Sequence, residues 1–396
     1  MRIAMIDPSL FTLPYDLALS RALRAQGCDV TLHGRRLRAL EDVSPDDGIE
    51  APFYALSERI KGHVPGKIFH LVKGLEHAVD ITRLARKFRR IPPSVVHFQW
   101  SALPAVDLAA VRYIRLSLAP AILTVHDVKP FNDAPTSMLQ RLGSSSIWRE
   151  FDHLITHSET SRAILCQHGI HAERISVIPH GVLDTAATTA PTLPDAAPVT
   201  ILLFGRIKPY KGIDLMIEAL GRIPPQLRTH CRVLIVGEPM MAVDTLQQRA
   251  AALGVAGNIV WDLRYVSDGD MAAVFRQADI FAFPYREIDT SGVLMSCLPY
   301  GKPIIASAVG AFPKILEDGV HGRIVPPEDP AALADAVTAL LTDPALRATY
   351  GHNVTTLSAR IPSWDVIAKQ TMAVYERLIH ARGGAAHRHG LRQLTA

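Results

Sequence analysis

Two short polar stretches in the second half of the chain carry residues suited to binding a phosphate. The first, residues 283–296, follows an apolar run that predicts a buried strand. A predicted short helix begins within it, so its first backbone N–H groups and the positive end of the helix dipole would favour an anion. Those N–H groups belong to Ser291, Gly292 and Val293. Glu287 in the same loop could hold sugar hydroxyls, although a simple helix cap would use the same Ser and Gly.

The second stretch, residues 204–212, also follows a predicted strand. It contains Gly205, Arg206 and Lys211, so two cations would stand at the end of a strand of the same domain. Two cations together with a helix N-terminus suit a diphosphate. The two stretches therefore predict a site for a sugar linked to a diphosphate.

Other segments extend this pattern through most of the chain. They include Thr124-Val125-His126-Asp127, Val177-Ile178-Pro179-His180-Gly181, Gly205-Arg206 with Lys211-Gly212, and Pro284 to Pro303. In this order the chain resembles a family 4 glycosyltransferase, a retaining enzyme of the GT-B fold that uses nucleotide-sugar donors. The resemblance implies a hexosyltransferase type of enzyme with the donor held mainly by the second domain.

The resemblance also implies roles for individual residues. Arg206 and Lys211 would neutralise the diphosphate, Glu287 would grip donor-sugar hydroxyls, and His126 would orient the sugar or polarise the acceptor. Together these four form the expected catalytic set. Donor binding is expected from Gly205, Arg264, Ser291, Gly292, Val293 and Ser296, with the base recognised by the backbone near Leu263-Arg264.

The chain departs from the family pattern at Ser296. Members carry two glutamates eight positions apart, and the second would fall on Ser296, the first on Ile288, one residue after Glu287. The second glutamate ordinarily holds the donor ribose. We expect Ser296 to face the ribose with a weaker hydrogen bond, worth about 0.5–1.5 kcal/mol against about 1.5–3 kcal/mol for a carboxylate.

Alternating strand and helix patterns predict an α/β protein, and the resemblance implies the GT-B fold, with two Rossmann-like doubly wound domains facing across a cleft. Residues 1–185 form the predicted acceptor-side domain and residues 199–362 the nucleotide-sugar-binding domain. The Ala-, Thr- and Pro-rich residues 186–198 predict a linker. Residues 363–382 show one apolar helical stripe, and the fold implies that this helix crosses back to the first domain. A polar tail, residues 383–396, is predicted to be disordered.

The amino-acid composition indicates a folded protein and bears on its partners and its cellular location. The 396 residues are 48% hydrophobic and 20% charged, which is typical of a folded protein with a sizeable core. A net charge of +4 gives no indication of nucleic-acid binding. The four cysteines lie far apart and suit a reducing cytoplasm. No signal-peptide pattern or membrane-spanning run is seen, so we expect a cytoplasmic protein, with peripheral binding to the inner face of the membrane as an option.

Residues 59–90 combine many Lys and Arg residues with apolar residues at helical spacing. A basic amphipathic helix is typical of a membrane surface element, whereas a helix packed on the sheet with a solvated basic face would look the same. Both interpretations stand at this stage. With membrane binding, the acceptor would be a lipid-linked glycan in surface polysaccharide assembly.

The sequence predicts neither a metal nor a cofactor. Asp268-Gly269-Asp270 matches the DxD triplet of metal-dependent glycosyltransferases, but it directly precedes a predicted helix, so capping explains it better. Two alternatives to the transferase remain. One is a nucleotide-sugar epimerase or a phosphorylase on the same frame, and the other is a non-catalytic homologue that only binds nucleotide sugars.

Overall fold

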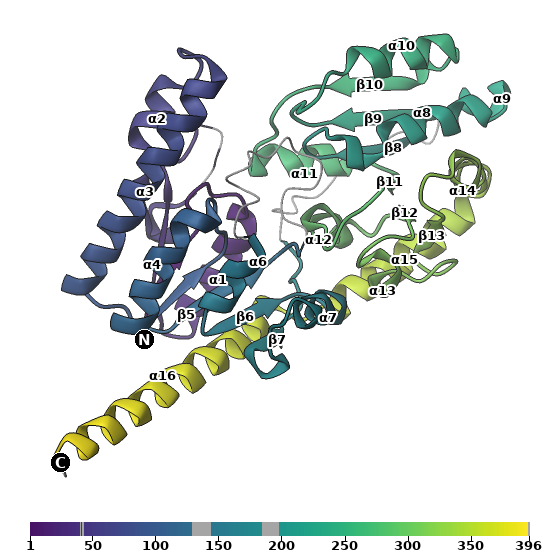
Figure 1. The fold of residues 1–396 in the computed structure, drawn as a ribbon. Coiled ribbons are helices and arrows are strands. Elements are labelled where there is room, and N and C mark those ends of the chain that lie inside the picture. The colour runs from purple at the N-terminus through teal and green to yellow at the C-terminus, as the bar shows by residue number, and fades with distance from the viewer. Residues whose placement is uncertain (40, 42, 129–143, 184–197, 395–396) are drawn as a thin grey trace.

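The computed structural model describes residues 1–39, 41, 43–128, 144–183 and 198–394. Two domains lie beside one another (Figure 1), each built on a parallel sheet covered by helices. This arrangement confirms the predicted α/β class with two doubly wound domains.

The first sheet has the strand order β3-β2-β1-β4-β5-β6-β7, and all its neighbouring strands are parallel. Its strands are β1 (Arg2–Ile6), β2 (Asp29–Arg35), β3 (Ile49–Phe53), β4 (Val95–Phe98), β5 (Ala121–Val125), β6 (His153–Thr156) and β7 (Ile175–Val177). Its helices are α1 (Leu13–Ala25), α2 (Ala55–Ile60), α3 (Gly66–Arg90), α4 (Pro104–Ser117), α6 (Ser144–Ile147) and α7 (Glu159–Gln167). Side chains on both faces of the central strands are buried, as expected for a sheet with helices on both sides.

The second sheet has the order β10-β9-β8-β11-β12-β13 and is also parallel. Its strands are β8 (Val199–Phe204), β9 (Cys231–Val236), β10 (Ile259–Asp262), β11 (Ile280–Phe283), β12 (Ile304–Ser307) and β13 (Gly322–Val325). Its helices are α8 (Ile213–Arg222), α9 (Pro225–Arg228), α10 (Asp244–Ala252), α11 (Asp268–Arg276), α12 (Gly292–Cys297), α13 (Phe312–Ile315), α14 (Pro330–Thr342) and α15 (Pro344–Arg360). In both sheets the order reverses beside the first strand, where ligands of such folds bind.

Three helices begin at serines whose side chains cap them. The Ser158 side chain accepts from the backbone N–H of Ser161 at the start of α7, and Ser291 accepts from that of Leu294 at α12. Ser267 does the same for Asp270 at α11, so the end of the DxD triplet lies in a helix cap, as predicted. Among the described residues, no group of three or more His, Cys, Asp or Glu side chains is placed to hold a metal ion.

The last helix, α16 (Trp364–Leu394), passes under the first domain (Figure 1). Ile367, Ala368 and Tyr375 pack into the same core cluster as β1 and α1. The helix continues to Leu394, beyond residue 383, where the disordered tail was predicted to begin. Glycines 383 and 384 do not end it, because glycine only weakens a helix by about 1 kcal/mol and no proline follows to break it.

The predicted linker, residues 186–198, lies almost entirely outside the described residues. The chain has already reached the second domain at Val182, which packs against that domain's core. No helix in the described part of the chain is both long and apolar enough to cross a membrane.

Candidate active site

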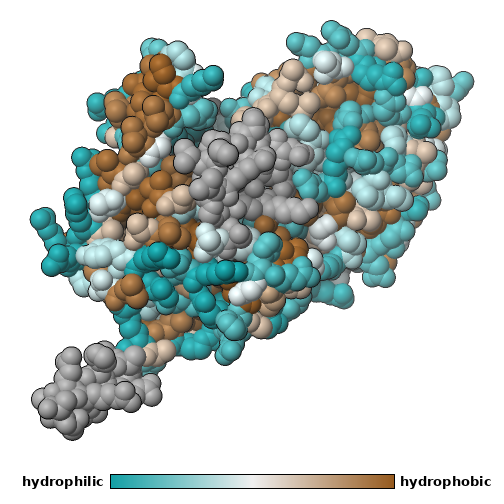
Figure 2. Space-filling view, viewed as in Figure 1, coloured by the Kyte–Doolittle hydropathy of each residue, from teal (hydrophilic) through white to brown (hydrophobic). Residues whose placement is uncertain are grey.

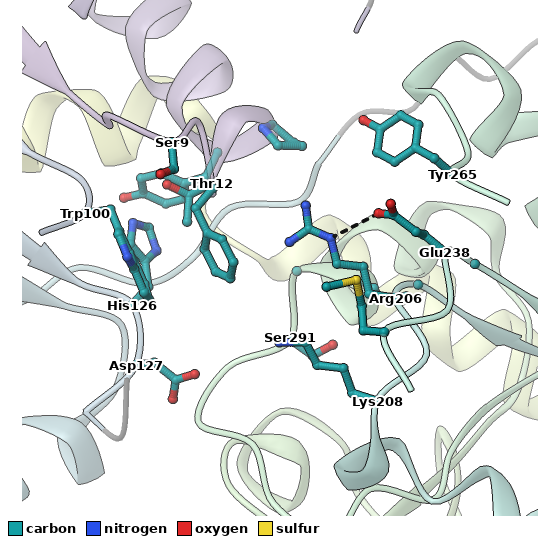
Figure 3. A pocket seen from close by; sticks show the side chains of 18 of the residues that line it. Ser9, Thr12, Trp100, His126, Asp127, Arg206, Lys208, Glu238, Tyr265 and Ser291 are labelled. Carbon is teal, nitrogen blue, oxygen red and sulfur yellow. Dashed lines mark ion pairs between the residues drawn. The ribbon is translucent and has the colours of Figure 1, made fainter. Parts of the chain in front are cut away.

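A cleft of about 1170 Å³ separates the two domains. Its walls include the loops that follow the carboxyl ends of β1, β4 and β5 in the first domain and of β8, β9 and β11 in the second. Figure 3 shows His126 and Asp127 on one side and Arg206, Lys208 and Ser291 on the other. The carboxyl ends of parallel strands lie at one edge of each sheet, so loops that are far apart in the sequence face one another here.

Three cations stand on the loop after β8. Arg206 extends into the cleft (Figure 3) with its guanidinium 5.5 Å from the Phe11 ring of the first domain. Its Nε lies 4.0 Å from the Glu238 carboxylate, a distance at which the ion pair is weak. Lys208 and Lys211 line the same wall. The loop therefore presents clustered positive charge to any ligand in the cleft.

Lys211 is the buried member of this group. Its Nζ donates to the carbonyl of Phe204 at 2.9 Å and to the Tyr285 hydroxyl at 2.8 Å. Burial, and then the charges of Lys208 and Arg206, lower the pKa of Lys211 to about 7. Gly205 makes this position possible, because a Cβ there would lie 2.9 Å from Nζ on a backbone with φ of 99°. Lys211 is thus partly neutral at physiological pH until an anion arrives.

The predicted anion cradle at α12 also lines the cleft, through Ser291, Gly292 and Val293. The Ser291 side chain is occupied as the helix cap. Ser296 lies one turn further along; its hydroxyl donates to the Gly292 carbonyl at 3.0 Å, and its side chain still borders the cleft. An oxygen that donates in this way keeps lone pairs with which to accept from a ligand hydroxyl.

Three histidines surround Tyr15 in the first domain. His126, His157 and His180 have ring centroids 4.7, 5.2 and 5.1 Å from the Tyr15 ring, and all three line the cleft. Burial lowers the pKa of His157 to about 4 and that of His180 to about 3, and it holds the pKa of His126 well below its usual range. The group is therefore neutral at pH 7.

Hydrogen bonds fix which ring nitrogens carry protons. The Ile178 carbonyl can only accept, so His157 Nδ1, 3.0 Å away, must donate to it. A neutral His157 then accepts at Nε2 from His126 Nδ1, at 3.1 Å. This leaves His126 Nε2 as an acceptor 3.3 Å from the side-chain amide of Gln99, which can satisfy it by turning its NH₂ group inward. His126 thus offers a lone pair, not a positive charge.

Two carboxyl groups from opposite domains meet beside His126. Asp289 accepts from the backbone N–H of Val128 at 2.6 Å, which joins the loop before α12 to the first domain. Asp127 is next to Val128 in sequence, and burial together with the charge of Asp289 raises the pKa of Asp127 to about 9. Asp127 therefore keeps its proton at neutral pH, because a second negative charge would be buried beside the Asp289 carboxylate of the other domain.

Two predicted site residues lie apart from the cleft wall. Arg264 pairs with Asp262 at 3.0 Å and with Asp270 at 3.1 Å, so carboxylates of its own region satisfy it; its neighbours Tyr265 and Val266 line the cleft instead. Glu287 is half-buried and contributes to the raised pKa of Asp127, but Ile288 and Thr290 are the residues of its loop that border the cleft.

Sequence reasoning missed several residues of the cleft. Asp127, His157, His180, Lys208 and Glu238 all line it. A signal existed for the histidines, since His126 follows β5, His157 follows β6 and His180 comes shortly after β7. His126, after β5, was predicted to be a site residue. The same position at the end of a parallel strand would have predicted His157 after β6 and His180 after β7.

Comparison with known proteins assigns the chain and its fold to a class. Residues 17–185 match the family described as Glycosyltransferase Family 4, and residues 198–343 match Glycosyl transferases group 1. Among solved structures, Anabaena HepE in complex with UDP superposes with a TM-score of 0.73 at 18% identity, covering 96% of this chain and all of that one. Sucrose-phosphate synthase from Thermosynechococcus elongatus gives 0.74 at 19% identity with the same coverage. Both share the GT-B fold.

Curated relatives agree over nearly the whole length. A phosphatidyl-myo-inositol mannosyltransferase from Mycobacterium leprae is 30% identical over 95% of this chain and 96% of its own length. A D-inositol 3-phosphate glycosyltransferase from Xylanimonas cellulosilytica is 28% identical over 93% of this chain and 92% of its own. The chain belongs to glycosyltransferase family 4. It is an enzyme that transfers a sugar from a nucleotide sugar, so the epimerase, phosphorylase and non-catalytic alternatives fall away.

Proposed function

We propose that this enzyme is a retaining glycosyltransferase that moves a hexose from a nucleotide-diphosphate sugar to an acceptor carried by a lipid at the inner face of the membrane. The observation that supports it best is the convergence of Arg206, Lys208 and Lys211 opposite His126 across one cleft. The donor would lie on the second domain, with its sugar pointing to the first.

The cations would act on the leaving group. Negative charge grows on the diphosphate as the bond to the sugar breaks, and preorganised charges aimed at it lower the barrier most. Arg206 is already in the cleft, whereas Lys211 gains its full charge beside the bound anion. Three cations of this kind supply what a divalent ion would otherwise give, so the proposal requires no metal.

His126 would hold the transferred sugar. Its Nε2 lone pair accepts from a sugar hydroxyl once the Gln99 amide gives way, and its neutral state avoids repelling positive charge that develops at the sugar carbon. Ser291 to Val293 would meet the donor phosphate or sugar through backbone N–H groups at the start of α12.

The lipid-borne acceptor is proposed from the outer face of α3. Ile68, Leu71, Leu75 and Val79 recur at three- and four-residue spacing and are about half or more exposed, with Leu71 and Leu75 each at 64%. Figure 2 shows apolar side chains gathered over α2 and α3 at the edge of the first domain. The opposite face of α3 carries the residues that pack on the sheet, among them Ile81, Leu84 and Phe88. Within the described part of the chain, this apolar stripe on the solvent side is therefore left largely uncovered.

Basic residues complete the surface expected of a membrane-bound helix. Exposed cations on α3 include Lys67, Arg83, Arg86, Arg89 and Arg90. Apolar area and basic charge together are the pattern by which interfacial helices hold anionic lipid. The mannosyltransferase relative is named for an inositol lipid, which fits an acceptor of this kind. A role in surface polysaccharide assembly stays a prediction.

The protein is expected to co-sediment with anionic vesicles at low salt and to be released at high salt, because each basic residue near the surface is worth about 1 kcal/mol and salt screens it. Leu71→Ser with Leu75→Ser should weaken binding, whereas Val260→Ser, at an exposed apolar residue of the other domain, should not. Failure to sediment at low salt would contradict membrane docking.

The donor can be identified with a thermal-shift screen against a panel of nucleotide sugars. The best stabiliser is then turned over with lipid extract or inositol phosphates, and the anomeric configuration of the product is read by NMR. Retention supports the proposal; inversion, or stabilisation by none of the panel, would refute it.

Ser296→Ala is expected to lower the affinity for the nucleoside diphosphate a few-fold, because the lost hydrogen bond is worth about 0.5–1.5 kcal/mol. Calorimetry measures it, with Ser358→Ala on α15 as the control. An unchanged affinity would show that the Ser296 hydroxyl serves only its bond to the Gly292 carbonyl.

A further inference from the structure

A second group of cations lines the first-domain wall of the cleft. They come from the end of β2, the turn between α2 and α3, and the first half of α3: Arg35, Arg38, Lys61, Lys67 and Lys73. None of them belongs to the donor-side loop after β8. The cleft therefore carries basic groups on both of its walls, one set on each domain.

Lys73 sits on a rigid platform. Its Nζ lies 4.4 Å from the centre of the Tyr54 ring, which is 1% exposed. The Tyr54 hydroxyl is 2.8 Å from His77 Nδ1, and His77 Nε2 is 2.6 Å from Asp107. The Tyr54 backbone, held in the left-handed region with φ of 62°, donates to Asp80 at 2.9 Å. Such a set of buried bonds fixes the ring and the cation above it.

The charges of this wall do not balance among the described residues. Arg35 is neutralised by a two-point contact with Glu41, at 2.5 and 2.8 Å, and Glu41 also accepts from the backbone of Arg38. Glu58 is the other carboxylate whose charge reaches Lys73. Burial, and then Arg38, Arg35 and Lys61, lower the pKa of Lys73 despite that carboxylate. The charged form of Lys73 is thus destabilised by burial and by the neighbouring cations, and a bound anion would offset this destabilisation.

We propose that Arg38, Lys61, Lys67 and Lys73 bind a phosphate group carried by the acceptor, at a subsite separate from the one that holds the donor diphosphate. The inference rests on the proposed transfer reaction, which it deepens by assigning the acceptor a phosphate. A guanidinium and several ammonium groups around one space favour a compact multivalent anion over a single carboxylate.

The position of the subsite suits either of two sources of that phosphate. Lys67 and Lys73 lie on the same half of α3 as the exposed Ile68, Leu71 and Leu75, so a lipid headgroup could enter the cleft while its chains stay on the stripe. A soluble phosphate monoester would use the same cations without the stripe.

The test uses the full-length protein saturated with the nucleoside diphosphate that the screen selects, so that the donor cations are already occupied. Glycerol 3-phosphate is titrated by calorimetry, and vesicles containing phosphatidic acid are sedimented at physiological salt. Lys73→Met with Arg38→Gln is expected to weaken binding about tenfold or more while nucleoside diphosphate affinity stays the same. Lys314→Gln, an exposed lysine of the second domain, is the control.

Loss of glycerol 3-phosphate binding in the double variant supports a soluble phosphate acceptor. Loss confined to vesicles supports a lipid headgroup. Equal binding by parent and double variant in both arms, or an equal loss in the Lys314 control, would overturn the subsite. If no nucleoside diphosphate binds at all, the proposed reaction itself fails, and the two failures are thereby distinguished.

Discussion

Replacing Arg206 or Lys211 with Ala is expected to lower kcat about tenfold or more and to weaken donor binding less. The contact with the diphosphate strengthens as charge moves onto it, and a hydrogen bond to a charged group is worth about 1.5–3 kcal/mol. Steady-state kinetics with the selected donor measure both effects, with Lys314→Ala as the control. Unchanged turnover in both variants would place the diphosphate elsewhere.

Lys211 should also couple donor binding to pH. Its pKa is about 7 in the free protein, and a bound diphosphate favours the charged form, so the pKa rises on binding. Donor affinity should therefore fall as pH rises through 7, and binding at pH 8 should take up about 0.9 proton. Calorimetry in buffers of different ionisation enthalpy measures this uptake. Lys211→Ala should abolish it; uptake that persists in the variant would assign the proton to another group.

The second large effect concerns Asp127. Burial and Asp289 raise its folded-state pKa to about 9 from 3.8, so the folded protein holds a proton that the unfolded chain releases above pH 4. The stability this proton gives is present at acidic pH and is lost as pH rises through 9. Between pH 6 and 9 the parent should lose up to about 3–4 kcal/mol, less if the domains open first.

Asp127→Asn should remove this dependence, because an amide donates to Asp289 at every pH. Its Tm should therefore match that of the parent near pH 4 and exceed it by a margin that grows as the pH rises, reaching several degrees or more at pH 9, by differential scanning calorimetry. Asp335→Asn, an exposed carboxyl for which nothing comparable is expected, is the control. A parallel decline of parent and Asp127→Asn would show that the carboxyl pair does not control the contact.

The sequence was a good guide wherever the signal was local. Ile280 to Phe283 were predicted as a buried strand because they form an apolar run, and capping was considered at Ser291 and preferred at the 268–270 triplet because each precedes a helical pattern. Arg206, His126 and Ser291 were placed at the cleft because each follows a recognisable strand.

Contacts between distant residues explain what was missed. Asp289 bonds the backbone 161 positions earlier, and His157 bonds His126 from the next strand of the sheet, so no spacing in the chain reveals either pair. Arg264 was placed in the site from its loop, whereas the choice between facing the cleft and facing Asp262 depends on side-chain geometry alone. The burial of Lys211, and with it the pKa near 7, likewise emerges only once Tyr285 is packed beside it.

The chain passes between the domains near Val182 and again near Trp364, and a hydrogen bond joins these two segments. Trp364, at the return crossing, donates its indole N–H to the Val182 carbonyl at the outward crossing, at 2.6 Å. Gly181 permits this approach, since a Cβ there would meet the indole at 2.7 Å. Two domains joined by a single segment can rotate and shift relative to one another in any direction. Two segments that are bonded to each other restrict the domains to rotation about one axis. We therefore expect the cleft to open by a hinge rotation of one domain relative to the other. On closing, the two domains would return to the same relative position, so that donor and acceptor meet in the same orientation at every turnover.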